Sequence, residues 1–190
     1  TTLAMIAGLL RADGGDILID DRVVSDLPTQ QRGVGLVFQD YAVFTSLSVE
    51  ANLAFGLEAR GIGRAERKRR VKELAEQLDL THLLKRRGAT LNMSEMQRVA
   101  LARVLIVEPS LLLLDEPMSN LDASVRANLR GELRQMQRAH GQTVFYVTHD
   151  QAEALSMSDR IAVMRGGKLL QIGTPEEIYQ QPISRFVAEF

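Results

Sequence analysis

Two adjacent carboxylates follow a run of four leucines, and this pattern suggests phosphate chemistry. Leu111 to Leu114 reads as a buried strand that Asp115 and Glu116 follow directly. In open parallel sheets, ligands bind beyond the carboxyl ends of the strands. One acid there can hold Mg²⁺, and the other can orient and deprotonate an attacking water. A strand end carrying two ordinary surface acids is the alternative interpretation.

Polar residues also follow two further apolar runs. Gln39 follows Val34 to Phe38, and His149 follows Thr143 to Thr148. A glutamine amide can ligate Mg²⁺ or hold a water, and a histidine can donate to a γ-phosphate oxygen. An isolated histidine is usually a plain loop residue. Three strand ends that meet at one edge of a sheet make a more specific pattern than any of them alone.

The elements that must position these residues alternate between strand and helix. A helix predicted over Ser124 to Ala139 lies between the runs Leu111–Leu114 and Thr143–Thr148, so a right-handed crossover in a parallel sheet is expected. Near the start, Leu3 to Leu10 reads as a helix and Asp16 to Asp20 as a short strand. Further strands and a capped helix are predicted near the end: a hairpin of Arg160–Met164 and Lys168–Ile172 around Gly166-Gly167, then a helix opened by a capping box of Thr174 and Glu177.

The middle of the chain has a different character, with helical patterns and little strand signal. Ser48 is a plausible N-cap, a charged helix follows over Arg64 to Leu78, and Val99 to Val107 reads as helical. We therefore divide the chain into an α/β core of residues 1–47 and 108–173, an inserted helical subdomain of residues 48–107, and a helical tail of residues 174–190.

Composition narrows the possible functions. Of 190 residues, 45% are hydrophobic and 25% charged, with a net charge of −1, which gives no general reason to expect nucleic acid as a partner. The basic run Arg64 to Arg70 is interpreted as solvated helix surface. Cysteine is absent, which excludes disulfides and thiolate metal sites. No apolar run approaches the roughly 20 residues that span a bilayer.

Over nearly all its length the chain resembles ABC-type ATPases. The segments VFQDYAVFTSLSVEANLAFGL and QIGTPEEIYQQPISRFVAEF are similar to those of maltose-, polyamine- and iron-type importer ATPases, in which a small β-rich regulatory domain follows. The resemblance implies a P-loop NTPase-type α/β fold, with a mostly parallel sheet and an inserted helical subdomain. It also implies residue roles: Gln39 in the Q-loop, Asp115 as the Walker B aspartate, Glu116 as the catalytic glutamate, His149 as the switch histidine, and Ser119, Asn120, Leu121 and Asp122 as the D-loop.

The phosphate-binding loop of the family ends in G-K-T-T or G-K-S-T before a leucine, and this chain begins Thr1-Thr2-Leu3. By resemblance, both threonines contact the nucleotide, and Thr1, Gln39 and Asp115 hold Mg²⁺. The glycines and the lysine are expected to precede Thr1, together with the N-terminal strands. Without them, the 190 residues alone are expected to be inactive.

The signature motif is the second departure from the family pattern. The family reads L-S-G-G-Q, and the aligned residues are Leu91, Asn92, Met93, Ser94 and Glu95. Asn92 replaces the serine that contacts the γ-phosphate on the partner subunit, and two glycines that permit close backbone approach are lost. Glu95 would bring a negative charge near a polyanion, at a repulsion on the order of several kcal/mol before screening.

The resemblance therefore implies an ATPase that uses ATP and Mg²⁺ and powers import of a small solute. It implies a second ABC ATPase subunit, permease subunits that contact Gln39–Leu47, an indirect link to a solute-binding protein, and a peripheral place on the cytoplasmic face of the bacterial inner membrane. An asymmetric dimer, in which this chain supplies the poor signature, and a divergent homodimer with slow hydrolysis both remain open. So do a non-transport ABC protein that acts on nucleic acid or ribosomes and a catalytically weak structural subunit. The transported solute cannot be read from the sequence.

Overall fold

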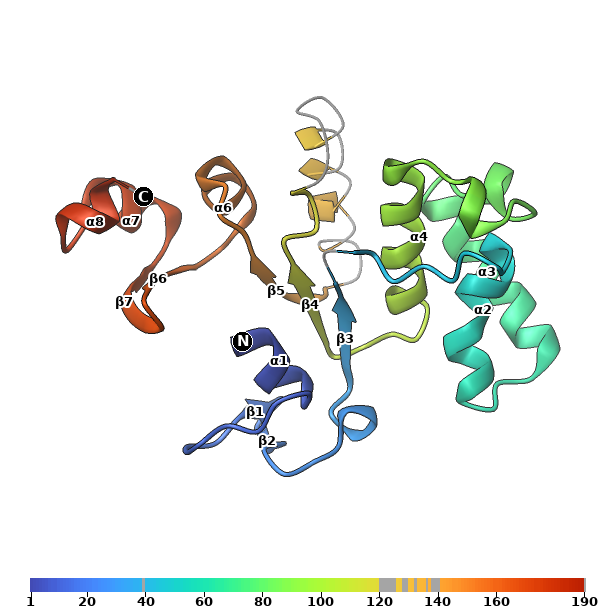
Figure 1. Ribbon diagram of the computed structural model, residues 1–190, viewed down its shortest axis with the longest axis horizontal. Coiled ribbons are helices and arrows are strands. Elements are labelled where there is room, and N and C mark those ends of the chain that lie inside the picture. The colour runs from blue at the N-terminus through green and yellow to red at the C-terminus, as the bar shows by residue number, and fades with distance from the viewer. Residues whose placement is uncertain are drawn as a thin grey trace.

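A three-stranded parallel sheet lies at the centre of the computed structural model, which describes the chain except for residues 39, 120–125, 128–129, 132, 136, 138–140 and 190. Its strands are β3 (Val34–Val37), β4 (Leu111–Asp115) and β5 (Thr143–Val147), in the order β3-β4-β5 (Figure 1). All strands run parallel, and Asp115 lies opposite Val147. The predicted parallel sheet is confirmed, with β4 in its middle because its leucines are apolar on both faces.

A short helix, α1 (Thr2–Ala7), packs on this sheet. Leu3 and Ala7 are buried in one cluster with Leu113 of β4. The prediction that the helix reaches Leu10 is wrong, because Gly8 ends it in the left-handed conformation at φ 79°. Glycine adopts that conformation without the steric cost of a Cβ atom, so it serves as a helix stop.

Two very short strands, β1 (Leu18–Ile19) and β2 (Arg22–Val23), form an antiparallel pair. They are shorter than the predicted strand over Asp16 to Asp20, since Asp20 and Asp21 turn the chain at φ 50° and φ 60°. A 3₁₀ turn at Thr29–Gln31 follows. The next residue, Arg32, is buried and donates to the carbonyl oxygens of Met5 and Ile6, which satisfies the end of α1.

Three helices lie in the chain between β3 and β4: α2 (Val49–Ala59), α3 (Arg64–Gln77) and α4 (Met93–Leu105), with 3₁₀ turns at Thr81–Leu83 and Gly88–Thr90. Ser48 caps α2 as predicted, since its hydroxyl accepts from the Ala51 amide at 3.1 Å. α4 begins six residues before the predicted Val99. The helices share one buried cluster with residues of β3 and β4. The division into a core and an inserted subdomain stays a prediction.

The last third of the chain carries α6 (Gln151–Met157), β6 (Ile161–Arg165), β7 (Lys168–Gly173), α7 (Pro175–Gln180) and α8 (Arg185–Ala188). The predicted hairpin is confirmed, with Gly166 and Gly167 at its turn. The capping box of Thr174 and Glu177 is confirmed as well. The helix predicted over Ser124 to Ala139 lies partly outside the described residues, and the described positions between Arg126 and Gln137 are helical.

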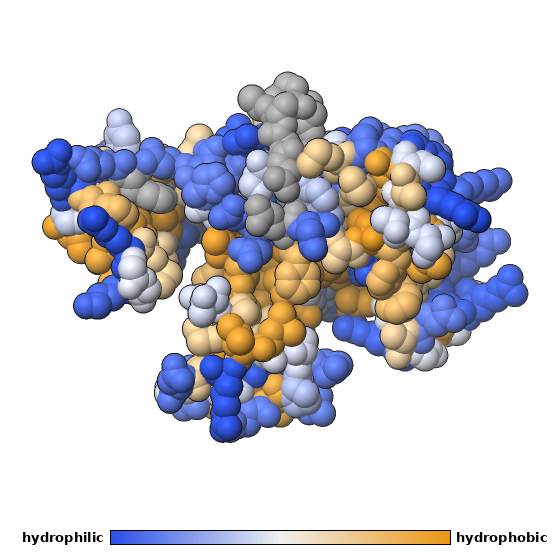
Figure 2. Space-filling view, viewed as in Figure 1, coloured by the Kyte–Doolittle hydropathy of each residue, from blue (hydrophilic) through white to orange (hydrophobic). Residues whose placement is uncertain are grey.

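The surface of α3 is strongly charged, as the blue area at the right of Figure 2 shows. Its arginines are paired along the helix: Glu66 accepts from both Arg69 and Arg70, and Glu73 accepts from Arg69. These pairs agree with the interpretation of the basic run as helix surface. No helix in the described part of the chain has the length and hydrophobicity that crossing a bilayer requires.

Candidate functional site

Glu116 and His149 meet beyond the carboxyl ends of β4 and β5. His149 Nδ1 lies 3.2 Å from Glu116 Oε2. The side chain of His149 is 72% exposed and that of Glu116 is 32% exposed, so both are open to a ligand. The pairing follows from the sheet order, because adjacent parallel strands end at the same edge. The sequence-based expectation that these two residues share a site agrees with this geometry.

The backbone of Glu116 turns sharply where β4 ends. Its φ is 46°, in the left-handed region that a non-glycine residue rarely adopts. Hydrogen bonds hold the turn: the Glu116 amide donates to Val147 O at 2.9 Å, and the Glu116 carbonyl accepts from the Ser119 amide at 3.2 Å. The Ser119 hydroxyl donates to the same carbonyl at 3.0 Å. The turn frees Glu116 from the alternation of the strand and leaves its carboxylate facing His149.

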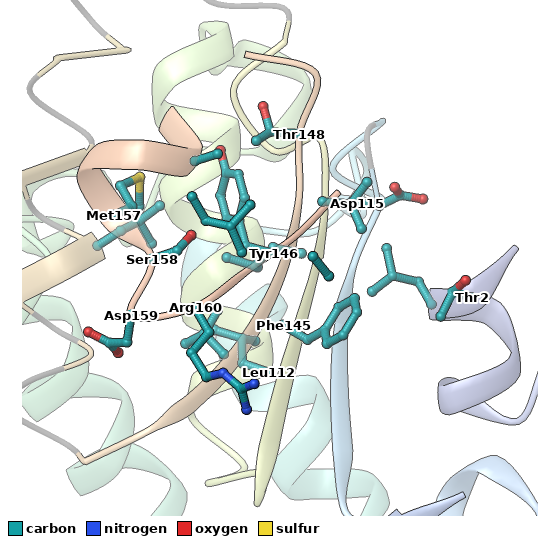
Figure 3. Close-up of a pocket in the computed structure, with 18 of the residues that line it drawn as sticks. Thr2, Leu112, Asp115, Phe145, Tyr146, Thr148, Met157, Ser158, Asp159 and Arg160 are labelled. Carbon is teal, nitrogen blue, oxygen red and sulfur yellow. The ribbon is translucent and has the colours of Figure 1, made fainter. Parts of the chain in front are cut away.

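Asp115 and the two N-terminal threonines lie at a cavity of about 550 Å³. Asp115 is the last residue of β4, Thr2 is the first of α1, and Thr1 is exposed beside it. Figure 3 shows the Asp115 carboxylate directed to the side of the pocket on which Thr2 lies. Hydroxyl and carboxylate oxygens therefore gather on one side of a pocket whose other walls are largely apolar.

The donor set at this place suits Mg²⁺ only in part. Oxygen ligands are what a hard cation prefers, and Asp115 and Thr1 offer them. In the part of the chain that the structure describes, however, no group of three or more His, Cys, Asp or Glu could hold a metal. Such a site would need oxygens from a bound nucleotide, which is how Mg²⁺ usually binds beside phosphates.

The aligned signature residues begin α4. Asn92 is the N-cap: its Oδ1 accepts from the Glu95 amide at 2.9 Å, and the Asn92 amide donates to Glu95 Oε2 at 2.8 Å. This is a reciprocal capping box. Leu91 is buried, Met93 is exposed and Ser94 is half-buried. The residues that depart from the family pattern thus form a well-capped helix start.

The charge of Glu95 is engaged locally. Arg86 Nη1 lies 2.9 Å from Glu95 Oε1, and the Glu95 side chain is only 19% exposed. The predicted repulsion toward a polyanion is that of an unpaired charge, whereas Glu95 is paired with Arg86. α4 packs against β3, whereas His149 follows β5, at the opposite edge of the sheet.

Four predicted site residues, Gln39, Asn120, Leu121 and Asp122, lie outside the described residues. The loop after Gln39 is described, and α2 holds its shape. The fully buried Asn52 accepts from the Phe44 amide and donates to the Phe44 carbonyl, each at 2.9 Å. The rings of Phe44 and Phe55 meet edge to face at 4.6 Å, and Phe55 is 49% exposed.

Sequence reasoning missed Glu153, a buried acid in the first turn of α6. Its side chain is 3% exposed and accepts hydrogen bonds from Tyr146 and Thr148. A glutamate three residues after Asp150 resembles part of a helix cap, but nothing in the sequence indicates its burial. Arg126, whose guanidinium pairs with Asp150, was missed for the same reason.

Comparison with known proteins places this chain in a family. The model of the ABC transporter family matches residues 1–119. The whole chain is 49% identical to sn-glycerol-3-phosphate import ATP-binding protein UgpC 1 of Rhizobium johnstonii and 48% identical to maltose/maltodextrin import ATP-binding protein MalK of Photorhabdus laumondii, and it covers 52% of each. The chain therefore spans about half the length of these curated relatives.

A solved structure shows the same fold. The chain superposes on cbiO1 from Clostridium perfringens, described as part of the ABC transporter complex cbiONQ, with a TM-score of 0.86 and 28% identity. The match covers 95% of this chain and 74% of that one. The parallel sheet, the helices between β3 and β4, and the family match agree with one another: this chain belongs to the ABC transporter family and has the fold of its ATPase domain.

Proposed function

We propose that the full-length gene product hydrolyses ATP and that this hydrolysis powers the import of a small solute. The contact of 3.2 Å between Glu116 and His149, at the end of the central strand, is the observation that carries the proposal. A carboxylate beside an imidazole at this edge of a parallel sheet can act on a water and a phosphoryl group together.

Within this proposal the two side chains divide the work. Glu116 orients the attacking water and accepts its proton. His149, which lies beside Glu116, donates a hydrogen bond to a γ-phosphate oxygen. The left-handed turn at Glu116 fixes the carboxylate before substrate binds, and such preorganisation is a large part of enzymatic rate enhancement.

Asp115, the Thr1 hydroxyl and Gln39 would hold Mg²⁺, and Thr1 and Thr2 would contact the nucleotide. When bound, the ion would neutralise charge on the phosphate oxygens. Asp115 and Thr1 line the same cavity, which supports this assignment. Ser119, with Asn120, Leu121 and Asp122 after it, would form the D-loop.

The protein would work as one subunit of a dimeric motor on the cytoplasmic face of the bacterial inner membrane. Its partners would be a second ABC ATPase subunit, permease subunits that contact Gln39–Leu47, and indirectly a solute-binding protein. The names of the relatives, both import ATP-binding proteins, support this proposal over a role on nucleic acid or ribosomes. The exposed Phe55 beside Phe44 supports a protein contact at this loop.

The test is Mg²⁺-dependent phosphate release by the full-length gene product. Glu116→Gln keeps the size of the side chain and removes its basicity, so hydrolysis is expected to fall by a factor of about 10² to 10⁴ while ATP still binds. The matched control is Glu76→Gln, an exposed acid of α3, which should hydrolyse at the wild-type rate. Wild-type hydrolysis by Glu116→Gln would rule out the proposed chemistry.

A further inference from the structure

A buried carboxylate lies directly behind the exposed His149. Glu153 Oε2 accepts from the Tyr146 hydroxyl at 2.6 Å and from the Thr148 hydroxyl at 2.7 Å. With 3% of its side chain exposed, Glu153 keeps a charged group away from water, which costs free energy unless several partners compensate. Burial, with the hydrogen bond to Glu153, raises the pKa of Tyr146 well above its usual value, so this hydroxyl stays a donor.

The residues on both sides of His149 are hydrogen-bonded to Glu153, Thr148 to its carboxylate and Asp150 to its backbone amide. Thr148, which precedes it, donates to Glu153 and accepts from the Asp150 amide at 3.0 Å. Asp150, which follows it, accepts from the Glu153 amide at 3.1 Å and so caps α6. The His149 side chain is 72% exposed. Its position is therefore set mainly through its neighbours in the chain and less through its own packing.

Arg126 places a positive charge near both Asp150 and Glu153. Its Nη1 lies 2.9 Å from Asp150 Oδ2, and its Nε lies 4.0 Å from Glu153 Oε1. Burial alone would raise the pKa of Asp150, but the hydrogen bonds from the Glu153 amide and from Arg126 outweigh it and keep that pKa below its usual value. Asp150 thus remains an ionised cap, and the turn that carries His149 is anchored at both ends.

We propose that Glu153 is a positioning residue whose carboxylate holds His149 against Glu116 through the Thr148 hydroxyl, which also accepts from the Asp150 amide. This inference rests on the proposed function, since it assigns Glu153 to the same hydrolytic site. Glu153 itself does not touch the water or the phosphate. It fixes the turn between β5 and α6, which lets an exposed histidine keep a defined place beside the catalytic acid.

The competing interpretation is that Glu153 has a purely structural role. The Tyr146 and Thr148 hydroxyls, which both donate to Glu153 Oε2, allow the two interpretations to be distinguished. Thr148→Val and Tyr146→Phe each remove one donor to Glu153 Oε2 and keep the shape of the side chain. Only Thr148 is joined to the turn that carries His149, through the Asp150 amide. Direct replacement of Glu153 is a poorer test, because it would leave several buried groups unpaired and unfold the protein.

The experiment measures kcat and KM for ATP hydrolysis by the full-length gene product, beside urea denaturation of each variant. We expect Thr148→Val to lower kcat about tenfold with KM for ATP little changed, since small misplacements of catalytic groups are costly. Tyr146→Phe should lose stability and keep its kcat. Thr148→Ser, which retains the hydroxyl, should restore hydrolysis.

A His149→Ala background completes the test. There, Thr148→Val should cause no further loss, because the residue that the turn positions is gone. Equal kcat values for Thr148→Val and Tyr146→Phe, or a full further loss in the His149→Ala background, would overturn the inference. Glu116→Gln, measured in the same series, tells the two failures apart: if it hydrolyses like the wild type, the proposed function is wrong, and if it is inactive, only the positioning role is at stake.

Discussion

Glu116 has a left-handed backbone conformation at φ 46°, and the residue proposed to do the chemistry therefore carries local strain. Two adjacent acids after a run of leucines could be recognised in the sequence as a site, and their placement at the end of β4 follows from the sheet. The turn itself could not be predicted, because glutamate has no preference for positive φ. A strained backbone conformation persists only where neighbouring residues fix it. At Glu116, hydrogen bonds with Val147 and Ser119 do so.

This strain predicts an unusual order of stability among variants. Glu116→Gly removes the Cβ atom that makes the left-handed conformation costly, whereas Glu116→Ala retains it. We expect the glycine variant to be more stable than the alanine variant by about 1 kcal/mol in urea denaturation. In an ordinary strand or helix the order is reversed, so a more stable alanine variant would contradict the strained turn.

His149 shows what sequence reasoning can predict at this scale, and Glu153 shows what it cannot. The neighbourhood of His149 and Glu116 could be predicted because both follow strands of one parallel sheet. The burial of Glu153 depends on Tyr146 and Arg126, which are distant in the chain or on another element. Such tertiary pairs leave no periodic pattern in a single sequence.

The start of α4 shows that residues aligned with a predicted functional motif can have a local structural role. Asn92 and Glu95, which we predict to align with the signature motif, form a capping box, with Arg86 paired to the acid. An N-cap residue with a glutamate three positions later is a capping-box pattern that a single sequence can show. The helix begins there, six residues before the predicted Val99.

The cap predicts how single changes at Asn92 affect stability. Asn92→Ala removes the acceptor for the Glu95 amide and is expected to cost about 1 kcal/mol in the free energy of unfolding. Asn92→Ser, which restores the family residue, keeps an acceptor and should leave the free energy of unfolding nearly unchanged. Urea denaturation of the two variants checks this, and equal stabilities would mean that the cap contributes little.

At the scale of the whole molecule, α2 carries an exposed aromatic side chain, Phe55, against the loop that follows β3. Asn52 fixes the backbone of Phe44, and Phe44 contacts the exposed ring of Phe55. Arg103 lies over the Phe44 ring at 4.1 Å from its centroid, which ties this loop to α4. The loop that holds Phe44 is therefore tied to both α2 and α4, and the proposed permease contact would rest on these residues.

This surface predicts the behaviour of the assembly. Phe55→Ser should weaken the co-purification of permease subunits with the full-length gene product, because an exposed aromatic side chain at a contact contributes strongly to binding. Leu18→Ser, at the equally exposed Leu18 of β1, is the matched control and should leave co-purification intact. If the two variants retain the permease subunits equally well, Phe55 is not part of the contact with them.

The central claim is that Glu116 and His149 act as one unit on ATP. The most direct measurement is ATP hydrolysis by the full-length gene product carrying Glu116→Gln, His149→Ala or both. Because residues that act together are non-additive, each single variant should lose most of the activity and the double variant should lose little more. Losses that multiply in the double variant, or wild-type rates in either single variant, would contradict the account.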